Sequence, residues 1–181
     1  MNEKTPPTAI ADIPSLLREL GIPEDYGREP PRRQYSEAKE LVEAGPNLLG
    51  RMQRLTPAAL RQWQLLEKAA TSDGLVLLLI SGFRSVIYQA DIIRNKLKAG
   101  QTLDEILKVS AAPGFSQHHT GMALDIASPG TRPLTEEFEH SPAFAWLIEN
   151  AKTYGFTMTY PRNNSEGFVF EPWHWACEAG D

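Results

Sequence analysis

Six consecutive apolar residues, Leu75 to Ile80, form the segment that most restricts how this chain can fold. Turn-forming pairs bound it, with Asp73-Gly74 before the segment and Ser81-Gly82 after it. A short apolar run between turn signals is typical of a strand that is buried in the core. We therefore expect a buried strand over residues 75–80.

Helices are predicted before and after this strand from their start and stop signals. An N-cap residue followed by proline opens two of them, at Thr56-Pro57 and at Ser141-Pro142. The first continues with apolar residues at helical spacing as far as Ala70, and the second ends at Gly155. A third helix is expected over 86–98, and a capping box that begins at Thr102 opens a short fourth one.

Three later segments have strand character: Met122 to Ile126, Phe156 to Tyr160 and Gly167 to Phe170. The turn-like sequence Asn163-Asn164-Ser165 separates the last two, and 111–120 is expected to be a loop. The chain is thus predicted to be α+β, with helices first and then a small antiparallel sheet that has helices on one side.

The chain of 181 residues is expected to form one domain, residues 36–181, preceded by an N-terminal arm. Residues 1–35 are rich in proline and charge, with one helical segment at Ser15 to Leu20, and we interpret them as an arm laid over the domain. A domain of this length buries a core without a structural metal, so any metal would serve chemistry.

Charge and cysteine content exclude several classes of function. A net charge of -5 with interspersed signs gives no basic face for nucleic acid. The single cysteine, Cys177, excludes an intramolecular disulfide and a cysteine-rich zinc site. We find no signal peptide and no membrane segment, so the chain as written is expected in the cytoplasm, with action in the cell wall or periplasm if another route exports it.

Histidines and acids cluster in the last third of the chain. His118 and His119 lie in the loop just before Gly121, a glycine that allows a tight bend from loop to strand. Asp125 follows on that otherwise apolar strand. A carboxylate buried among apolar residues is costly without a cation, and a metal is the simplest cation to supply. Adjacent residues of an extended segment point to opposite sides, so only one of the two histidines can easily face such a metal.

The second part of the cluster is Glu171-Pro172-Trp173-His174. Pro172 argues against a helix here, so the metal ligands must converge from separate segments. Two histidines and one carboxylate are the ligand set of a catalytic zinc site, since they leave one tetrahedral position for water. A second carboxylate beside that water is suited to accept its proton.

Each of these residues also has an ordinary structural explanation. His140 is interpreted as a histidine with satisfied hydrogen bonds, Asp125 could end a strand, and Glu171 could be solvated. Their joint presence favours the metal site over these separate explanations.

Four motifs in order resemble the zinc D-alanyl-D-alanine carboxypeptidases of the VanY type, which are related to VanX dipeptidases and to L-alanyl-D-glutamate endolysins. The resemblance covers about residues 75–175. The motifs are Ser81-Gly82-Phe83-Arg84-Ser85, Ser116 to Asp125, Trp146-Leu147 through Ala151 to Tyr154-Gly155-Phe156, and Glu171-Pro172-Trp173-His174. The resemblance implies a DD-peptidase or hedgehog-like zinc fold and a peptidoglycan peptide as substrate.

The resemblance also implies roles for single residues. The zinc ligands, for one Zn²⁺ per chain, would be His118 rather than His119, Asp125 and His174, with Glu171 as general base. Arg84 would bind substrate or stabilise the oxyanion, and its structural alternative is a salt bridge at a strand end. Ser116 would contact substrate and Gln89 would support Arg84 or the substrate, the structural alternative being ordinary polar residues of a loop and a helix.

Two positions depart from the family pattern. Thr159 and Ala176 stand where many members carry arginine, so the terminal carboxylate of the peptide is gripped differently here or another substrate is preferred. The predicted reaction is hydrolysis of a C-terminal D-alanine linkage. The alternatives are an LD-carboxypeptidase, a D-Ala-D-Ala dipeptidase, an endolysin-type endopeptidase, a zinc-bearing binding module without activity, and a regulatory protein whose arm covers the cleft.

Overall fold

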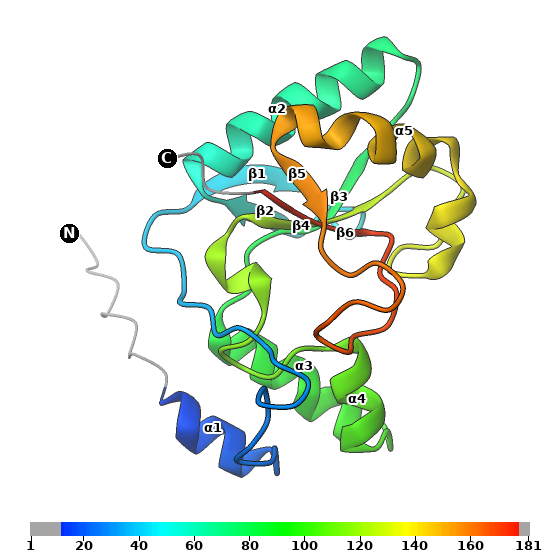
Figure 1. Ribbon diagram of the computed structural model, residues 1–181. Coiled ribbons are helices and arrows are strands. Elements are labelled where there is room, and N and C mark those ends of the chain that lie inside the picture. Colours follow the sequence, from blue (N-terminus) through cyan, green and yellow to red (C-terminus); the bar gives the residue numbers. More distant parts are fainter. Residues whose placement is uncertain (1–11, 178–181) are drawn as a thin grey trace, which may run out of the picture.

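A four-stranded antiparallel sheet lies at the centre of the molecule, with the strand order β3-β4-β6-β5. The computed structural model describes residues 12–177 (Figure 1). The strands are β3 (Leu78–Ser81), β4 (Ala123–Ala127), β5 (Phe156–Met158) and β6 (His174–Cys177). A separate two-stranded sheet precedes them, formed by β1 (Val42–Pro46) and β2 (Met52–Leu55).

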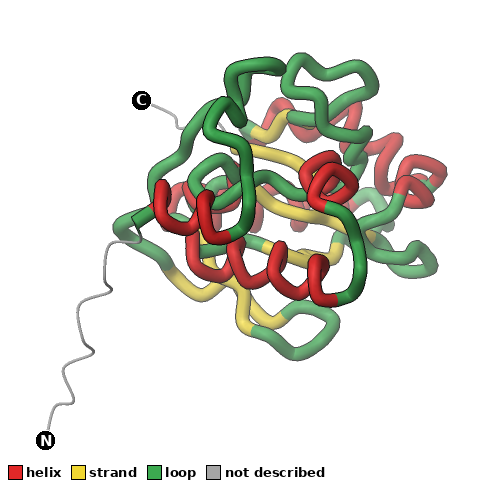
Figure 2. Tube along the Cα trace, turned by 90° about the horizontal axis from the view of Figure 1, so that it is seen from below, coloured by secondary structure: helices red, strands yellow, loops and turns green. Residues whose placement is uncertain are grey.

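Helices cover both faces of the central sheet. They are α1 (Ile13–Glu19), α2 (Pro57–Ser72), α3 (Val86–Lys98), α4 (Leu103–Val109) and α5 (Pro142–Asn150), with 3-10 turns η1 (Gln117–Thr120), η2 (Glu136–His140) and η3 (Ala151–Tyr154). In Figure 1, α2 and α5 lie on one side of the sheet, and α1, α3 and α4 lie on the other. The view from below in Figure 2 accordingly has helices in front of the strands. The α+β prediction is confirmed, but the expectation of helices on one side of the sheet is wrong.

The predicted helix starts are present with their capping hydrogen bonds. The hydroxyl of Thr56 accepts from the backbone N–H of Ala59, and Ser141 does the same for Phe144. Thr102 forms the full capping box with the side chain three positions later. Each such cap stabilises its helix by about 1 kcal/mol. Because a cap joins residues that are three positions apart, these helix starts could be predicted from the sequence.

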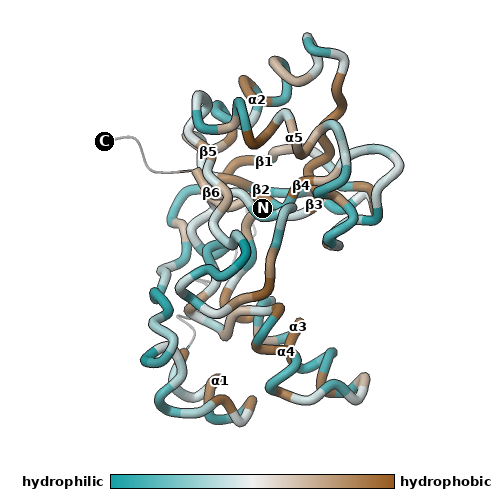
Figure 3. Tube along the Cα trace, turned by 45° about the vertical axis from the view of Figure 1, so that its right-hand side comes forward, coloured by the Kyte–Doolittle hydropathy of each residue, from teal (hydrophilic) through white to brown (hydrophobic). Residues whose placement is uncertain are grey.

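Strand β4 separates a hydrophobic core from the face that carries the candidate site. Leu124 and Ile126 are fully buried in a core formed with α2 and α5, whereas Asp125 points to the opposite face. A second core joins α1, α3 and α4. The hydropathy colouring of Figure 3 shows hydrophobic stretches around the sheet and again around α3 and α4. The candidate site lies between these two cores.

Two predictions of local structure need correction, and one element was not predicted. The apolar run at 75–80 becomes a strand only from Leu78, because the chain is still leaving α2 and Val76 is half exposed. Residues 167–170 are not a strand, since Val169 donates to the carbonyl of Lys108 and β5 pairs with β6 instead. The hairpin β1–β2 was not predicted, because Gly45 and Pro46 interrupt its strand pattern.

The described part of the predicted arm packs against the second core. Its helix α1 begins two residues earlier than predicted, and the following Leu20 and Ile22 are buried beside α3 and α4. Arg32 donates to the carbonyl of Glu166 and stacks over Phe168. No helix within residues 12–177 has the length and apolar character that crossing a bilayer needs.

Candidate metal centre

Asp125 and His174 face each other on neighbouring strands. They are direct partners in the antiparallel pairing of β4 with β6, so their side chains project from the same face of the sheet. Nδ1 of His174 lies 3.1 Å from Oδ1 of Asp125, and both residues are buried. The strand register thus holds two of the predicted ligands side by side.

His118 reaches the same point from the turn η1. Gly121 ends this turn in the left-handed conformation (φ 65°), and a Cβ there would lie 2.8 Å from Leu41, so the predicted bend requires glycine. Nδ1 of His118 donates to the carbonyl oxygen of Gly82 at 2.7 Å. Its Nε2 lies 3.2 Å from Oδ1 of Asp125.

A glutamine next to His118 sets the orientation of His174. The Nε2–H of His174 donates to Oε1 of Gln117 at 2.8 Å, and the amide nitrogen of Gln117 donates to the hydroxyl of Tyr35 at 3.3 Å. The hydrogen bond that one ring nitrogen makes decides which nitrogen carries a lone pair. His174 therefore presents the lone pair of Nδ1 toward Asp125.

Three electron-pair donors converge without a proton between them. Nε2 of His118 is buried and has no hydrogen-bond partner, and burial lowers the pKa of His118 to about 4, so the ring is neutral at pH 7. Ligand atoms of His118, Asp125 and His174 all lie within 4.8 Å of one another. Metal–ligand bonds of about 2.0–2.1 Å in a tetrahedron place ligand atoms about 3.3 Å apart, close to the separations from Asp125. The donor set fits a zinc ion.

Arg84 lies beside this donor set. Its Nη2 is 2.8 Å from Oδ2 of Asp125, and its Nη1 approaches Oε1 of Gln89 at 3.5 Å. Burial works against the charged form of Asp125, yet the guanidinium of Arg84 helps to hold the pKa of Asp125 well below its usual range. The buried carboxylate of Asp125 thus has a cationic partner in Arg84. From the sequence we had expected a metal ion to be its only cationic partner. Nε of Arg84 is buried without a partner.

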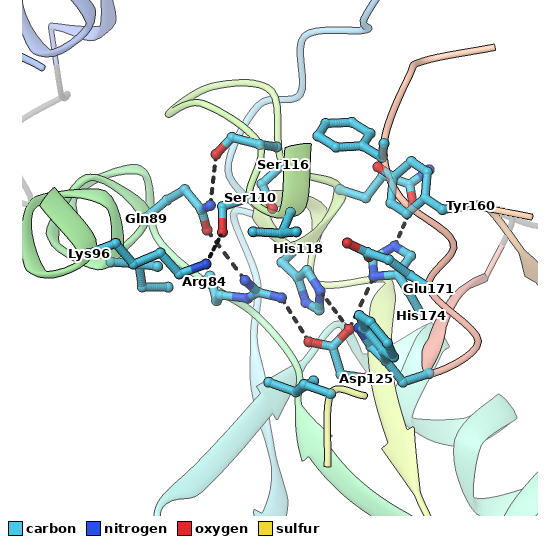
Figure 4. Close-up of a pocket in the computed structure, with 17 residues that line it drawn as sticks. Arg84, Gln89, Lys96, Ser110, Ser116, His118, Asp125, Tyr160, Glu171 and His174 are labelled. Carbon is cyan, nitrogen blue, oxygen red and sulfur yellow. Dashed lines mark hydrogen bonds and ion pairs between the residues drawn. The ribbon is translucent and has the colours of Figure 1, made fainter. Parts of the chain in front are cut away.

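Glu171 stands beside the donor set but is not one of its members (Figure 4). It precedes β6, and its backbone N–H donates to the carbonyl of Tyr160. Glu171 is 8% exposed, and burial raises its pKa to about 7, with Asp125 acting in the same direction. A carboxylate in these surroundings is well suited to exchange protons near neutral pH.

A cavity of about 410 Å³ contains all of these groups. The predicted substrate-contacting residues Ser116 and Gln89 both line it, and both are buried. Further lining residues were not predicted: Lys96, Ser110, Gln117, Leu134, Tyr160 and Phe168. Tyr160 stacks on the His174 ring at 4.8 Å, and its place before Pro161 in the sequence was the one available signal for it.

The other two histidines lie away from the donor set. His119 is buried, its Nδ1 donates to the carbonyl of Arg84, and its Nε2 accepts from the N–H of Gly114. Its ring thereby joins two segments that line the cavity. His140 has a side chain that is 79% exposed and lies 3.7 Å from Glu139, away from the cavity.

The two departures from the family pattern line a different cavity. Thr159 and Ala176 belong to a second cavity of about 530 Å³, which also includes Arg33 and Tyr35. Gln117 lines both cavities and lies in the wall between them. The residues that replace the arginines are therefore not part of the cavity that contains Glu171.

Comparisons with known proteins agree on one family. Residues 52–179 match the model of a family described as VanY, D-alanyl-D-alanine carboxypeptidase. The putative carboxypeptidase YodJ of Bacillus subtilis is 37% identical over 111 residues, which are 59% of this chain and 40% of YodJ. This chain thus spans less than half the length of that relative.

Solved structures also resemble this fold. The LdcB LD-carboxypeptidase has a TM-score of 0.69 and 30% identity, covering 78% of this chain and 69% of LdcB. A variant of the vancomycin-resistance D,D-pentapeptidase VanY in complex with Zn(II) has a TM-score of 0.60 and 30% identity, covering 76% and 78% of the two chains.

Proposed function

Because this chain belongs to the VanY family of D-alanyl-D-alanine carboxypeptidases, we propose that it is a zinc carboxypeptidase that removes the C-terminal D-alanine of peptidoglycan peptides. One observation carries the proposal. Lone pairs of His118, Asp125 and His174 converge in a cavity whose wall also holds the buried carboxyl of Glu171. The VanY relative was solved in complex with Zn(II), which supports zinc as the metal.

The residues around the donor set have separate tasks. Zinc at this position would polarise the scissile carbonyl and lower the pKa of water. Glu171 accepts a proton from the attacking water at its carboxylate and then donates it to the leaving amine. Its burial favours both steps, since the protonated and ionised forms are then close in free energy near pH 7.

We assign to Arg84 the stabilisation of the negative charge that develops on the carbonyl oxygen during the reaction. Its guanidinium is held by Asp125 on one side and approaches Gln89 on the other, so its position is fixed before the reaction. Ser116 and Gln89 add polar groups to the same wall and are assigned to the substrate.

An LD-carboxypeptidase is the second candidate, favoured by the TM-score of 0.69 to LdcB. The two activities differ in the stem peptide that they shorten, because an LD-carboxypeptidase acts on a tetrapeptide and a DD-carboxypeptidase on a pentapeptide. A binding module without activity is disfavoured, since it would not need Glu171 buried beside the ligands. The described part of the arm, residues 12–35, does not line the cavity, which disfavours a covered cleft.

Defined muropeptides test the proposal. Zinc-loaded protein is incubated with stems of four and of five residues, and the products are identified by mass spectrometry. We expect the pentapeptide to lose one alanine. Loss of alanine from the tetrapeptide alone would establish the LD activity instead, and two intact stems would contradict both assignments.

A further inference from the structure

A second cation, Lys96, enters the wall of the cavity from α3. Gln89, Ile92 and Lys96 follow one another at spacings of three and four residues, so they share one face of this helix, and all three line the cavity. Figure 4 shows the ammonium of Lys96 on the same side of the cavity as Arg84, away from Glu171 and His174. Nζ of Lys96 donates to the hydroxyl of Ser110 at 2.8 Å.

The two cations of this wall differ in how their charge is balanced. Arg84 is paired with Asp125 at 2.8 Å. Lys96 takes part in none of the ion pairs formed within residues 12–177. Its hydrogen-bond partner Ser110 is neutral and uses one of the three ammonium donors. Among the described residues, no carboxylate is in ion-pair contact with Lys96, and Glu171, the carboxyl that raises its pKa, acts on it only across the cavity.

A partly buried ammonium without an ion-pair partner is unfavourable unless a ligand supplies the negative charge. The side chain of Lys96 is partly buried, and an ammonium removed from water without an anion is destabilised. Burial, and after it the positive charge of Arg84, lower the pKa of Lys96, and the opposing effect of Glu171 is smaller.

An exopeptidase has a specific need for such a charge. It recognises the end of its substrate by the terminal carboxylate, which lies one residue, about 3.5 Å, beyond the scissile carbonyl. Thr159 and Ala176 are neutral and line the other cavity, and Arg84 is already paired. We propose that Lys96, together with the hydroxyl of Ser110, binds the C-terminal carboxylate of the peptide, an assignment that rests on the proposed function.

The experiment compares two substrates that differ only in this carboxylate. A blocked peptide that ends in D-Ala-D-Ala is compared with the same peptide as its C-terminal carboxamide, using wild type, Lys96→Met and Lys96→Arg. Lys98→Met is the matched control, since Lys98 lies on the same helix but is exposed and does not line the cavity. Zinc content and melting temperature of each variant are measured as well.

We expect Lys96→Met to raise KM for the free acid by roughly 10- to 100-fold, the usual effect of losing one charge-assisted hydrogen bond. Turnover of bound peptide, zinc content and melting temperature should change little. The variant should lose its preference for the acid over the carboxamide, Lys96→Arg should restore part of it, and Lys98→Met should behave as wild type.

Two results would overturn the assignment. One is an equal loss on both substrates, which would make Lys96 a purely structural residue. The other is a wild-type enzyme that binds acid and carboxamide equally well. Calorimetry with D-Ala-D-Ala and with its carboxamide tests whether Lys96 of the zinc-loaded protein binds the carboxylate, independently of catalysis. Absence of hydrolysis would therefore contradict the proposed function, while the role of Lys96 would still be decided by the binding measurement.

Discussion

Replacement of Glu171 by glutamine separates catalysis from metal binding. The substitution keeps the shape of the side chain and removes its capacity to accept a proton. Glu171 is not in the donor set formed by His118, Asp125 and His174, so the variant should bind zinc as wild type does. No ion pair of this carboxyl is lost, and the melting temperature should stay the same or rise, because burial of an ionisable carboxyl is unfavourable.

The size of the activity loss follows from the composition of the cavity. Among the described residues that line it, only Asp125 and Glu171 carry carboxylates, and Asp125 is engaged by Arg84. No second carboxylate of the cavity is therefore free to replace Glu171. We expect turnover to fall by about two to four orders of magnitude, or roughly 2.7–5.4 kcal/mol in activation free energy.

The assay combines steady-state release of D-alanine with elemental analysis of the same preparation. Near-full zinc with activity reduced by this amount would agree with a general base. If Glu171→Gln loses its zinc, Glu171 is a ligand and the roles of the two acids must be exchanged. If the variant keeps both zinc and full turnover, the catalytic mechanism is wrong.

Four further outcomes are expected. Gln117→Ala leaves Nε2 of His174 without its acceptor and should weaken zinc affinity about 10- to 100-fold in a chelator competition. His118→Ala should abolish zinc binding in elemental analysis, whereas His119→Ala should retain the metal, because only the former belongs to the donor set. Arg84→Ala should raise KM and lower kcat together in steady-state kinetics, as expected for a group that acts on substrate and oxyanion. Removal of zinc should lower the melting temperature in calorimetry, since a ligand at about 1,000 times its Kd stabilises the fold by about 4 kcal/mol.

The features that could be predicted from the sequence depend on residues that are close to one another along the chain. Helix starts at Thr56, Thr102 and Ser141 depend on contacts three positions away, and all three are present. The spacing from His118 to Asp125 within one motif, and from Glu171 to His174 in another, gave the candidate site. Strand pairing between β4 and β6 then brings the two motifs together.

The features that were missed depend on contacts between distant segments. Gln117 gains significance only because His174, 57 residues later, donates to it. Lys96 reaches the cavity from a helix whose sequence contains several other polar residues at helical spacing. Residues 167–170 have strand composition, but their backbone groups pair outside any sheet, for example with Lys108. Tertiary contacts of this kind override local propensity.

Titration of zinc into metal-free protein, with D-alanine release measured at each step, tests the central claim most directly. Activity on a peptide that ends in D-Ala-D-Ala should be absent without zinc, rise in proportion to added metal, and level off at one equivalent per chain. Full activity in the absence of zinc, or saturation with zinc that produces no D-alanine, would contradict the claim that His118, Asp125 and His174 hold the catalytic zinc of a carboxypeptidase.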